Sequence, residues 1–406
     1  MDRIIFHIDV NSAFLSWTAL DLLNNGASLD IRTVPAIIGG DIKKRHGVVL
    51  AKSIPAKKYG IQTGEPIVNA FRKCPTLLLE SPDHASYQAH SRDFIRFLTQ
   101  ICPDIEQVSI DECFLDYTPI AAKFPSPEVA ASYIKDNIRD RFGFTVNVGI
   151  SDRKILAKMA SDFQKPDKIH TLYKREIKAK MWPLPVSDLF MCGRSSVETL
   201  HKLEIDTIGQ LAQADPSILE THLKSHGRLL WEYANGIDDS GVETEPAKAK
   251  GIGNSITLKE DALTRETALP ALRSLAESVS YRLRKEGQLA SLINTEIKYS
   301  TFRSVSHQSL LNEPTNSSEL IYRTACRLFD EIWDGSPIRL LGIRSARLTE
   351  ESDPIQLNLF DYSQKNPDSA RQQNLDKAID SIRSRFGKDA IVRGSLYRRT
   401  DDFKKH

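Results

Sequence analysis

The sequence has few cysteines, and they follow neither a disulfide nor a metal-binding pattern. There are five of them among 406 residues, an odd number, scattered along the chain and without CxxC spacing. A disulfide framework needs paired cysteines, and a zinc site needs closely spaced ones. We therefore expect reduced thiols and no zinc.

Long apolar runs are missing as well. No segment reaches the roughly 20 apolar residues that a membrane helix requires. The N-terminal sequence MDRIIFHID is interrupted by charge too early for a signal peptide. We expect a soluble, cytoplasmic protein without a membrane partner.

Neither charge nor length singles out a function. The net charge of +2 neither requires nor excludes a nucleic-acid partner, because a basic face can be balanced by acids elsewhere. The composition, 40% hydrophobic and 27% charged, is that of a globular protein. A chain of 406 residues predicts about two to four domains.

Two adjacent acids, Asp111 and Glu112, lie between short segments in which apolar and polar residues alternate. The pattern over residues 105–117 predicts two short strands joined by a tight turn, with both acids at the turn. A buried carboxylate without a partner is costly, and a divalent cation is a natural partner. Such a site needs a third acid from elsewhere in the chain.

Asp9 is the candidate for this third acid. It lies near the end of a predicted buried strand, residues 3–10, and just before a predicted helix, residues 12–23. A simpler interpretation is that this segment only caps the helix. Capping would explain Asn11 or Ser12 but would leave Asp9 without a role.

The order of the predicted elements favours a particular sheet. Helices are expected at residues 85–102, 128–142 and 154–163, and a strand at residues 145–150. Together with the first strand and the acidic hairpin, this order is typical of a split β-α-β, ferredoxin-like sheet. On that sheet the three acids can converge.

Three converging acids suit a pair of Mg²⁺ ions, because hard cations prefer oxygen ligands. Two such ions support in-line displacement at a nucleotide α-phosphate, with pyrophosphate leaving. A DNA polymerase and a nucleotide cyclase both use this chemistry, so these residues alone leave both open.

Two other regions are candidates for contact with nucleic acid. Residues 191–196 predict a hairpin that enters a helix N-terminus, where free N–H groups can hold a phosphate, although an ordinary helix cap explains them equally well. Residues 251–348 predict a separate α/β domain with helices at 268–286 and 318–333. Its strands alternate bases with core residues, which predicts one basic face. The bases are Lys298, Arg303, Arg339, Arg344 and Arg347, and the core residues are Ile297, Tyr299, Leu341, Ile343 and Ala346.

Three segments resemble, in order and spacing, signature segments of the Y-family, translesion DNA polymerases. They are Asp9 to Phe14, Ser109 to Glu112, and Lys154 to Pro166. The resemblance runs from residue 3 to about residue 350. It implies an α+β, right-hand polymerase fold with a ferredoxin-like palm, small fingers, a helical thumb and a separate α/β little finger.

The resemblance also implies boundaries for these domains. The palm would comprise residues 1–34 and 80–170, with the fingers inserted at residues 35–79. The thumb, with a helix-hairpin-helix-like segment, would follow at residues 171–240. A linker, the DNA-binding little finger and a tail would take up residues 241–249, 250–350 and 351–406.

Site residues carry over from the family position by position. Asp9, Asp111 and Glu112 would be the catalytic metal ligands for two Mg²⁺ ions, with the carbonyl of Val10 as a further ligand. Phe14 matches the aromatic residue that excludes a 2′-hydroxyl, although it could also be an ordinary core aromatic.

Contacts to phosphate and DNA carry over in the same way. Lys165 matches the lysine that reaches the β- and γ-phosphates, and Lys57 stands where an arginine is usual. Gly193 would contact a DNA phosphate, and Arg303 and Arg344 would bind DNA from the little finger.

The sequence departs from the family mainly at the expected triphosphate site. Ala51 replaces a threonine, Ile54 replaces a tyrosine, and Lys57 is a point charge in place of a bidentate guanidinium. We expect nucleotide binding to be weaker, or rebuilt around the lysines of this segment, Lys52, Lys57 and Lys58. In the thumb hairpin, Met191 stands where a glycine is usual.

The tail contains one apolar pentapeptide, residues 356–360, in a polar stretch. It resembles the bacterial peptide that binds the sliding clamp, with Gln356 fixing the register and Leu357, Leu359 and Phe360 filling an apolar groove. A stray strand is the alternative interpretation. Beyond it, residues 376–386 predict a short basic helix.

The sequence therefore predicts an error-prone, template-directed DNA polymerase for translesion synthesis. Its expected partners are primer–template DNA, dNTP and the sliding clamp, and we expect a monomer. The altered triphosphate residues keep one alternative open, a DNA- and clamp-bound repair accessory protein with little polymerase activity. A nucleotide cyclase is less consistent, because it has no use for a thumb, a basic domain or a clamp peptide.

Overall fold

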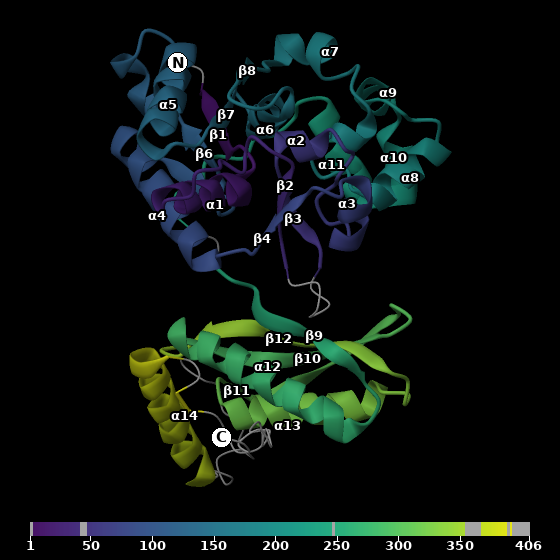
Figure 1. The fold of residues 1–406 in the computed structure, drawn as a ribbon. Helices are drawn as coiled ribbons and strands as arrows, with labels where there is room; N and C mark the ends of the chain where they lie inside the picture. The colour runs from purple at the N-terminus through teal and green to yellow at the C-terminus, as the bar shows by residue number, and fades with distance from the viewer. Residues whose placement is uncertain (1–2, 41–46, 246–247, 354–366, 388–389, 392–406) are drawn as a thin grey trace. The chain divides into compact units, whose positions relative to one another are not determined.

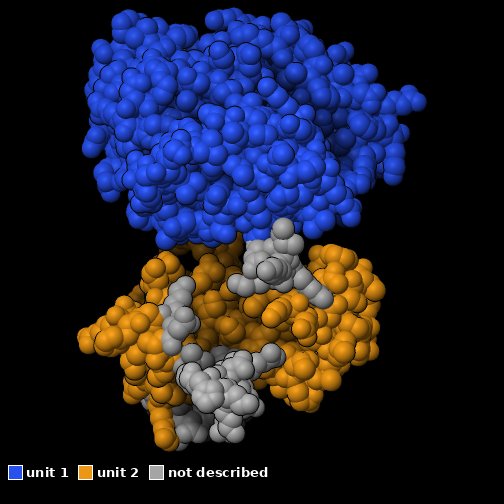
Figure 2. Space-filling view, viewed as in Figure 1, with its two compact units in different colours: residues 1–246 blue, residues 247–406 orange. Residues whose placement is uncertain are grey.

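The structure is a computed structural model that describes residues 3–40, 47–245, 248–353, 367–387 and 390–391. The chain divides into two compact units, residues 1–246 and residues 247–406, which are coloured separately in Figure 2. All five cysteines are buried free thiols, as the sequence predicts. None of the helices in the described ranges has the length and apolar character that crossing a membrane requires.

The first unit contains a five-stranded sheet with the order β5-β6-β1-β7-β8 (Figure 1). The central strand β1 pairs antiparallel with both β6 and β7. This is the split β-α-β sheet that the sequence predicts. Its strands are β1 (Ile5–Val10), β5 (Ile105–Gln107), β6 (Glu112–Asp116), β7 (Val146–Ser151) and β8 (Ile169–Thr171).

Helices cover this sheet on both faces. The helices are α1 (Ala13–Asn24), α4 (His84–Ile101), α5 (Pro127–Phe142) and α6 (Lys154–Asp162). Phe6, Ile8 and Val10 of β1 pack into the core that α4 and α5 share, whereas Ile5 contacts α6 through Ala157. Because side chains alternate along a strand, His7 and Asp9 lie on the same face as Ile5.

The boundaries of α5 illustrate how local sequence sets these helices. The Ser126 side chain accepts a hydrogen bond from the N–H of Val129, and Pro127 occupies the first turn, where its missing N–H costs nothing. The helix ends at Gly143, whose φ of 74° suits glycine. Both signals are visible in the sequence. The helix predicted at residues 128–142 begins one residue later than α5 does in the structure.

A small sheet of three strands, β3-β2-β4, is inserted between α1 and α4. It consists of β2 (Ala36–Gly39), β3 (Val49–Lys52) and β4 (Leu78–Glu80), with the short helices α2 (Ile54–Lys57) and α3 (Ile67–Lys73). It has a core of its own around Ile37, Val49 and Ile67.

Helices dominate the remainder of the first unit. They are α7 (Ile177–Lys180), α8 (Arg194–Lys202), α9 (Ile208–Gln213), α10 (Pro216–Leu223) and α11 (Ser225–Ala234), with 3-10 turns at Thr118–Lys123, Lys174–Glu176 and Val186–Asp188. Their core also includes Ile155, Leu156 and Met159 of α6. Helix α6, which carries Lys158 toward β1, is therefore fixed by the packing of its apolar residues against these helices.

The second unit is a four-stranded antiparallel sheet with the order β11-β10-β12-β9. Its elements are β9 (Gly251–Ala262), α12 (Arg265–Lys285), β10 (Gln288–Tyr299), β11 (Ser304–Thr315), α13 (Ser318–Ile332) and β12 (Ile338–Glu350). Helices α12 and α13 share one core with Ile293, Ile297 and Ile343 of the sheet. The predicted helices at 268–286 and 318–333 are confirmed within three residues.

A final helix, α14 (Pro367–Phe386), is longer than the sequence predicts, since the sequence indicates a helix only at residues 376–386. It contacts α12 and α13 of the same unit through polar groups. Asp376 accepts hydrogen bonds from the N–H and the hydroxyl of Ser318, at 3.0 and 2.7 Å. Arg284 pairs with Asp380 at 2.6 Å, and Arg383 pairs with Glu277 at 2.9 Å.

Candidate active site

Three carboxylates meet at one end of the five-stranded sheet. Asp9, near the end of β1, is the cross-strand partner of Glu112, the first residue of β6. The carbonyl of Asp111, in the turn before β6, accepts a hydrogen bond from the N–H of Val10 at 3.0 Å. Residues about 100 positions apart in the chain are thus brought together by backbone pairing.

The turn that contains Asp111 is held by its own side chains. The hydroxyl of Ser109 donates a hydrogen bond to Asp111 at 2.7 Å, and the Gln107 amide donates to the Ser109 carbonyl at 2.9 Å. Burial, together with the charges of Asp9 and Glu112, raises the pKa of Asp111. This mutual repulsion is the electrostatic condition that a bound cation relieves.

The surroundings of Glu112 lower its pKa, whereas those of Asp111 raise the pKa of Asp111. The Nε2 of the buried His7 lies 3.3 Å from its Oε2, and the Lys158 ammonium on α6 lies 2.7 Å from the same oxygen. His7 first, and then Lys158, lower the pKa of Glu112 to about 2. The Ser161 hydroxyl lies 2.8 Å from Nδ1 of His7 and donates to the carbonyl of Lys158, also at 2.8 Å.

Lys165 lies beside Asp9. Its ammonium forms ion pairs with Asp9 and, at 2.8 Å, with Asp162. Burial works against the charged form of Lys165, but these two carboxylates prevail and raise its pKa. Lys165, the predicted phosphate ligand, therefore contacts Asp9, a predicted metal ligand.

Asn11 holds the loop that carries Lys165. Its side-chain oxygen accepts the N–H of Asp167 at 2.9 Å, and its amide donates to Asn147 at 3.1 Å. Asn147 in turn donates to the carbonyl of Gln164 at 2.7 Å. Ser12, the N-cap of α1, makes no capping hydrogen bond through its side chain. The simpler interpretation, that these residues only cap the helix, is therefore wrong.

The donor chemistry of the three acids fits Mg²⁺, because every available ligand atom is an oxygen. In the described part of the chain, however, no group of three His, Cys, Asp or Glu side chains is already arranged to hold a metal ion. Lys158 and Lys165 now hold Glu112 and Asp9. Val10 is buried, and the role of its carbonyl stays a prediction.

A cavity of about 310 Å³ lies next to this cluster. Lys57 and Lys165, the two predicted phosphate ligands, both line it. Ile54, which replaces the usual tyrosine, lines it too and is exposed, whereas Lys58 does not line it. Its other lining residues are Asn11, Ser12, Leu15, Ser16, Arg32, Lys52, Ser53, Thr145 and Pro166.

Phe14 belongs to an aromatic group beside the same site. Its ring stacks on Tyr87, with centroids 4.5 Å apart and planes inclined by 14°. His84 meets it edge-on at 6.0 Å, and Trp17 lies 6.3 Å away. The ring is half-buried, so it can both pack in the core and present a rigid edge.

Gly193 is exposed and lies at the N-cap of α8. A Cβ at this position would meet no atom within 4 Å, so open space surrounds it. Met191 has a φ of 70°, a conformation that favours glycine. This explains why a glycine is usual at the position that Met191 occupies.

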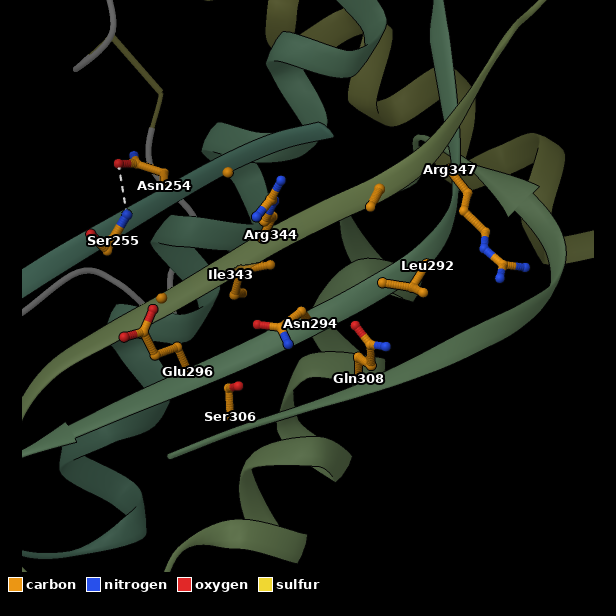
Figure 3. A pocket seen from close by; sticks show the side chains of 13 residues that line it. Asn254, Ser255, Leu292, Asn294, Glu296, Ser306, Gln308, Ile343, Arg344 and Arg347 are labelled. Atoms are coloured by element: carbon orange, nitrogen blue, oxygen red, sulfur yellow. Dashed lines mark hydrogen bonds between the residues drawn. The ribbon is translucent and has the colours of Figure 1, made fainter. Parts of the chain in front are cut away.

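The open face of the second unit carries a groove of about 980 Å³ (Figure 3). Arg344 and Arg347 of β12 line it together with polar side chains from the neighbouring strands, among them Asn294, Gln308 and Ser255. Arg344 is exposed and lies opposite Gly253, where the missing side chain leaves its stem uncovered.

The prediction of one basic face and one core face is wrong in three respects. Arg303 is exposed but forms an ion pair with Asp334 and lies over the Tyr299 ring. Lys298 and Arg339 contact the ring of Phe302 outside the groove. Ala346, predicted in the core, lines the groove because it shares the face of Arg344, two residues earlier.

The clamp-binding candidates Gln356, Leu357, Leu359 and Phe360 lie outside the described residues.

Sequence reasoning missed His7, Asn11, Arg32, Asn147 and Lys158 as parts of the site. No local pattern marks them, because their roles depend on how α6 and the loop that carries Lys165 pack against β1.

Comparison with known proteins gives a consistent result. The profile of the "impB/mucB/samB family" matches residues 8–162, and that of the "impB/mucB/samB family C-terminal domain" matches residues 249–359. The chain is 48% identical to "DNA polymerase IV" of Clostridium acetobutylicum, over 98% of both chains. It is 34% identical to "DNA polymerase IV 1" of Bacillus subtilis, over 99% of this chain and 95% of that relative.

Among solved structures, the fold is similar to a "Y-family DNA polymerase chimera Dbh-Dpo4(243-245)-Dbh". The TM-score is 0.73, and the likeness covers 87% of this chain and all of the other. Sequence identity is 20%, so this likeness concerns the fold alone.

Proposed function

The chain belongs to the impB/mucB/samB family of Y-family DNA polymerases, and we propose that it carries out error-prone translesion synthesis of DNA. It is a DNA-directed DNA polymerase with the α+β polymerase fold. The convergence of Asp9, Asp111 and Glu112 next to a cavity lined by cations carries the mechanistic part of this proposal.

In the proposed reaction, the primer 3′-hydroxyl loses its proton to solvent, and its oxygen forms a bond to the α-phosphorus of a dNTP. The bond from that phosphorus to the bridging oxygen breaks, and pyrophosphate leaves. Asp9, Asp111, Glu112 and the Val10 carbonyl would hold two Mg²⁺ ions, which would activate the attacking oxygen and stabilise the leaving one. Ser109 orients Asp111, and His7 and Lys158 keep Glu112 ionised.

Lys57 and Lys165 would bind the β- and γ-phosphates of the nucleotide. If Lys165 exchanges its contact with Asp9 for a phosphate oxygen, Asp9 also becomes free to bind a cation. Phe14 would lie under the incoming sugar and exclude a 2′-hydroxyl, with Tyr87 keeping its ring in place.

We further propose that the family boundaries hold for this chain, with the palm at residues 1–34 and 80–170 and the fingers at residues 35–79. The fingers form a small sheet of three short strands, which favours a roomy site with little checking of base-pair shape. Gly193 would contact the DNA backbone from the thumb, and Arg344 from the little finger. Arg303 would first have to leave Asp334.

The proposed setting is the bacterial cytoplasm, where the enzyme would act as a monomer on primer–template DNA. Residues 356–360 would bind the sliding clamp. A second candidate function is an accessory protein that binds DNA and clamp but synthesises little. The residues Ala51, Ile54 and Lys57 favour it, because the resemblance places polar or bidentate triphosphate ligands at these positions.

Primer extension separates these two functions. We expect the purified protein to extend a primer with Mg²⁺ and dNTPs, to pass a damaged template base, and to be stimulated by the clamp. If it binds the primed template and the clamp but adds no nucleotide at any dNTP concentration, the accessory role is correct and the proposal of translesion synthesis is wrong.

A further inference from the structure

The cavity beside the acidic cluster is more basic than the family signature requires. Besides Lys57 and Lys165, the cations Lys52 and Arg32 line it, and neither carries over from the resemblance as a site residue. Four cationic side chains therefore surround a volume of about 310 Å³, close to the lower limit for ligand sites. Such a space suits a compact polyanion.

Two of the four cations are already neutralised. Lys165 pairs with Asp9 and Asp162. Arg32 makes a bidentate contact with Asp30 at 2.8 and 2.9 Å and also donates to the carbonyl of Gly143 at 2.7 Å. Arg32 is thus a fixed part of the wall, and its bonds leave it little freedom to follow a ligand.

Lys52 is not neutralised in this way. It ends β3, directly before the turn that contains Ile54, and it forms no ion pair with a described residue. Glu65, the carboxylate that acts on it from a distance, already pairs with Lys73 at 2.6 Å. Burial and the nearby Lys57 lower the pKa of Lys52, and a phosphate bound beside the two ammonium groups would favour the charged form of both.

We propose that Lys52 is a triphosphate-binding residue that compensates for the tyrosine that Ile54 replaces. This inference rests on the proposed polymerase function and assigns a further residue to its nucleotide site. An ammonium group at this wall of the cavity supplies a charge-assisted hydrogen bond to phosphate, which is stronger than the bond from a phenol. The ligand class is the polyphosphate of a nucleotide, independent of its base.

Steady-state primer extension on an undamaged template tests the proposal. We expect Lys52→Ala to raise the KM for dNTP roughly 10- to 100-fold, the effect of removing one hydrogen bond between charged groups, with a smaller change in kcat. Lys52→Arg should restore most of the affinity. Lys123→Ala is the matched control, because Lys123 is exposed and does not line the cavity.

Inorganic triphosphate provides a readout that a structural role would not change. It should compete with dNTP in the parent enzyme and inhibit Lys52→Ala at least several-fold more weakly. An unchanged KM and an unchanged inhibition constant in Lys52→Ala would overturn the assignment while leaving polymerase activity intact. A parent enzyme that adds no nucleotide would instead overturn the proposed function.

Discussion

At the scale of single residues, the proposed catalytic acids differ in the side chains that contact them. Asp9 is held by Lys165, Asp111 by the Ser109 hydroxyl, and Glu112 by His7 and Lys158. Two ammonium groups therefore balance part of the charge of three carboxylates. Lysines compensate for the burial of Asp9 and Glu112, whereas the pKa of Asp111, which is held by a hydroxyl, is raised.

Glu112 should make the stability of the first unit sensitive to acid. Its pKa lies at about 2 in the folded chain, against an ordinary value of 4.5, so its contribution is fully present above pH 4.5 and is lost as pH falls toward 2. The shift corresponds to at most about 3 kcal/mol. In the presence of a chelator, Glu112→Gln should destabilise the protein by up to this amount at pH 7 and by much less at pH 3.

Chemical unfolding at the two pH values measures this difference. Glu198→Gln is the control, because Glu198 forms only an exposed pair with Arg194 and should change stability little at either pH. A destabilisation by Glu112→Gln that does not vary with pH would contradict the role of His7 and Lys158.

Phe14 should control the choice of sugar. Because Tyr87 fixes its ring, Phe14→Ala removes the edge that would meet a 2′-hydroxyl and opens the space beneath the sugar. We expect ribonucleotide incorporation to rise roughly 10- to 100-fold relative to dNTP, the range that steric discrimination spans. Single-nucleotide insertion with rNTP and dNTP measures the ratio. Lower stability of Phe14→Ala with unchanged sugar selection would show that Phe14 is a core residue without a role in choosing the sugar.

At the scale of secondary-structure elements, the contact between β7 and α6 positions Lys158 and the loop that carries Lys165. Gly149 of β7 makes this contact possible. A Cβ at Gly149 would lie 2.0 Å from the carbonyl oxygen of Ala157 and 2.5 Å from the N–H nitrogen of Ser161, both backbone atoms that cannot rotate away. The helix carrying Lys158 would have to move.

Gly149→Ala should therefore destabilise the protein by roughly 1–3 kcal/mol and lower activity. Gly193→Ala is the control for stability, because a Cβ there meets nothing within 4 Å and its φ of −74° is accessible to any residue. Thermal unfolding of both variants measures the difference. Equal melting temperatures would show that the helix and strand can separate without cost.

Local signals explain which elements could be predicted. The strand at Asp9, the acidic hairpin and helix α5 follow from alternation, turn residues and capping. The sequence predicts helix α14 too short because Asp376, Asp380 and Arg383 bond to α12 and α13, and partners so far away in sequence are invisible locally. The same reason hides His7, Lys158 and Asn11, whose partners are brought near by folding.

At the scale of the whole molecule, the proposed activity would combine a catalytic unit, a DNA-binding unit and a clamp-binding segment. The two family profiles match residues 8–162 of the first unit and residues 249–359 of the second. The separate domain at residues 251–348 could be predicted from its own pattern. The boundaries of palm, fingers and thumb and the clamp peptide could be proposed only through resemblance, because their physical signals are weak.

The clamp peptide should affect processive synthesis and not chemistry. Replacing Leu359 and Phe360 together by Ala removes two apolar anchors, so we expect clamp stimulation to disappear and basal synthesis to be kept. Asn358→Ala is the control, because Asn358 is not a proposed anchor. Primer extension with and without a loaded clamp is the measurement, and equal stimulation of the double variant and the parent would argue against the motif.

The central claim is that Asp9, Asp111 and Glu112 together form the site of nucleotidyl transfer. Asp111→Asn tests it most directly, because it removes one charge from the cluster while keeping the size of the side chain. With Mg²⁺, dNTPs and a primed template, we predict no detectable extension by Asp111→Asn, unchanged DNA binding, and full activity of Asp93→Asn, which alters an exposed acid on α4. Extension by Asp111→Asn at the rate of the parent would contradict the claim.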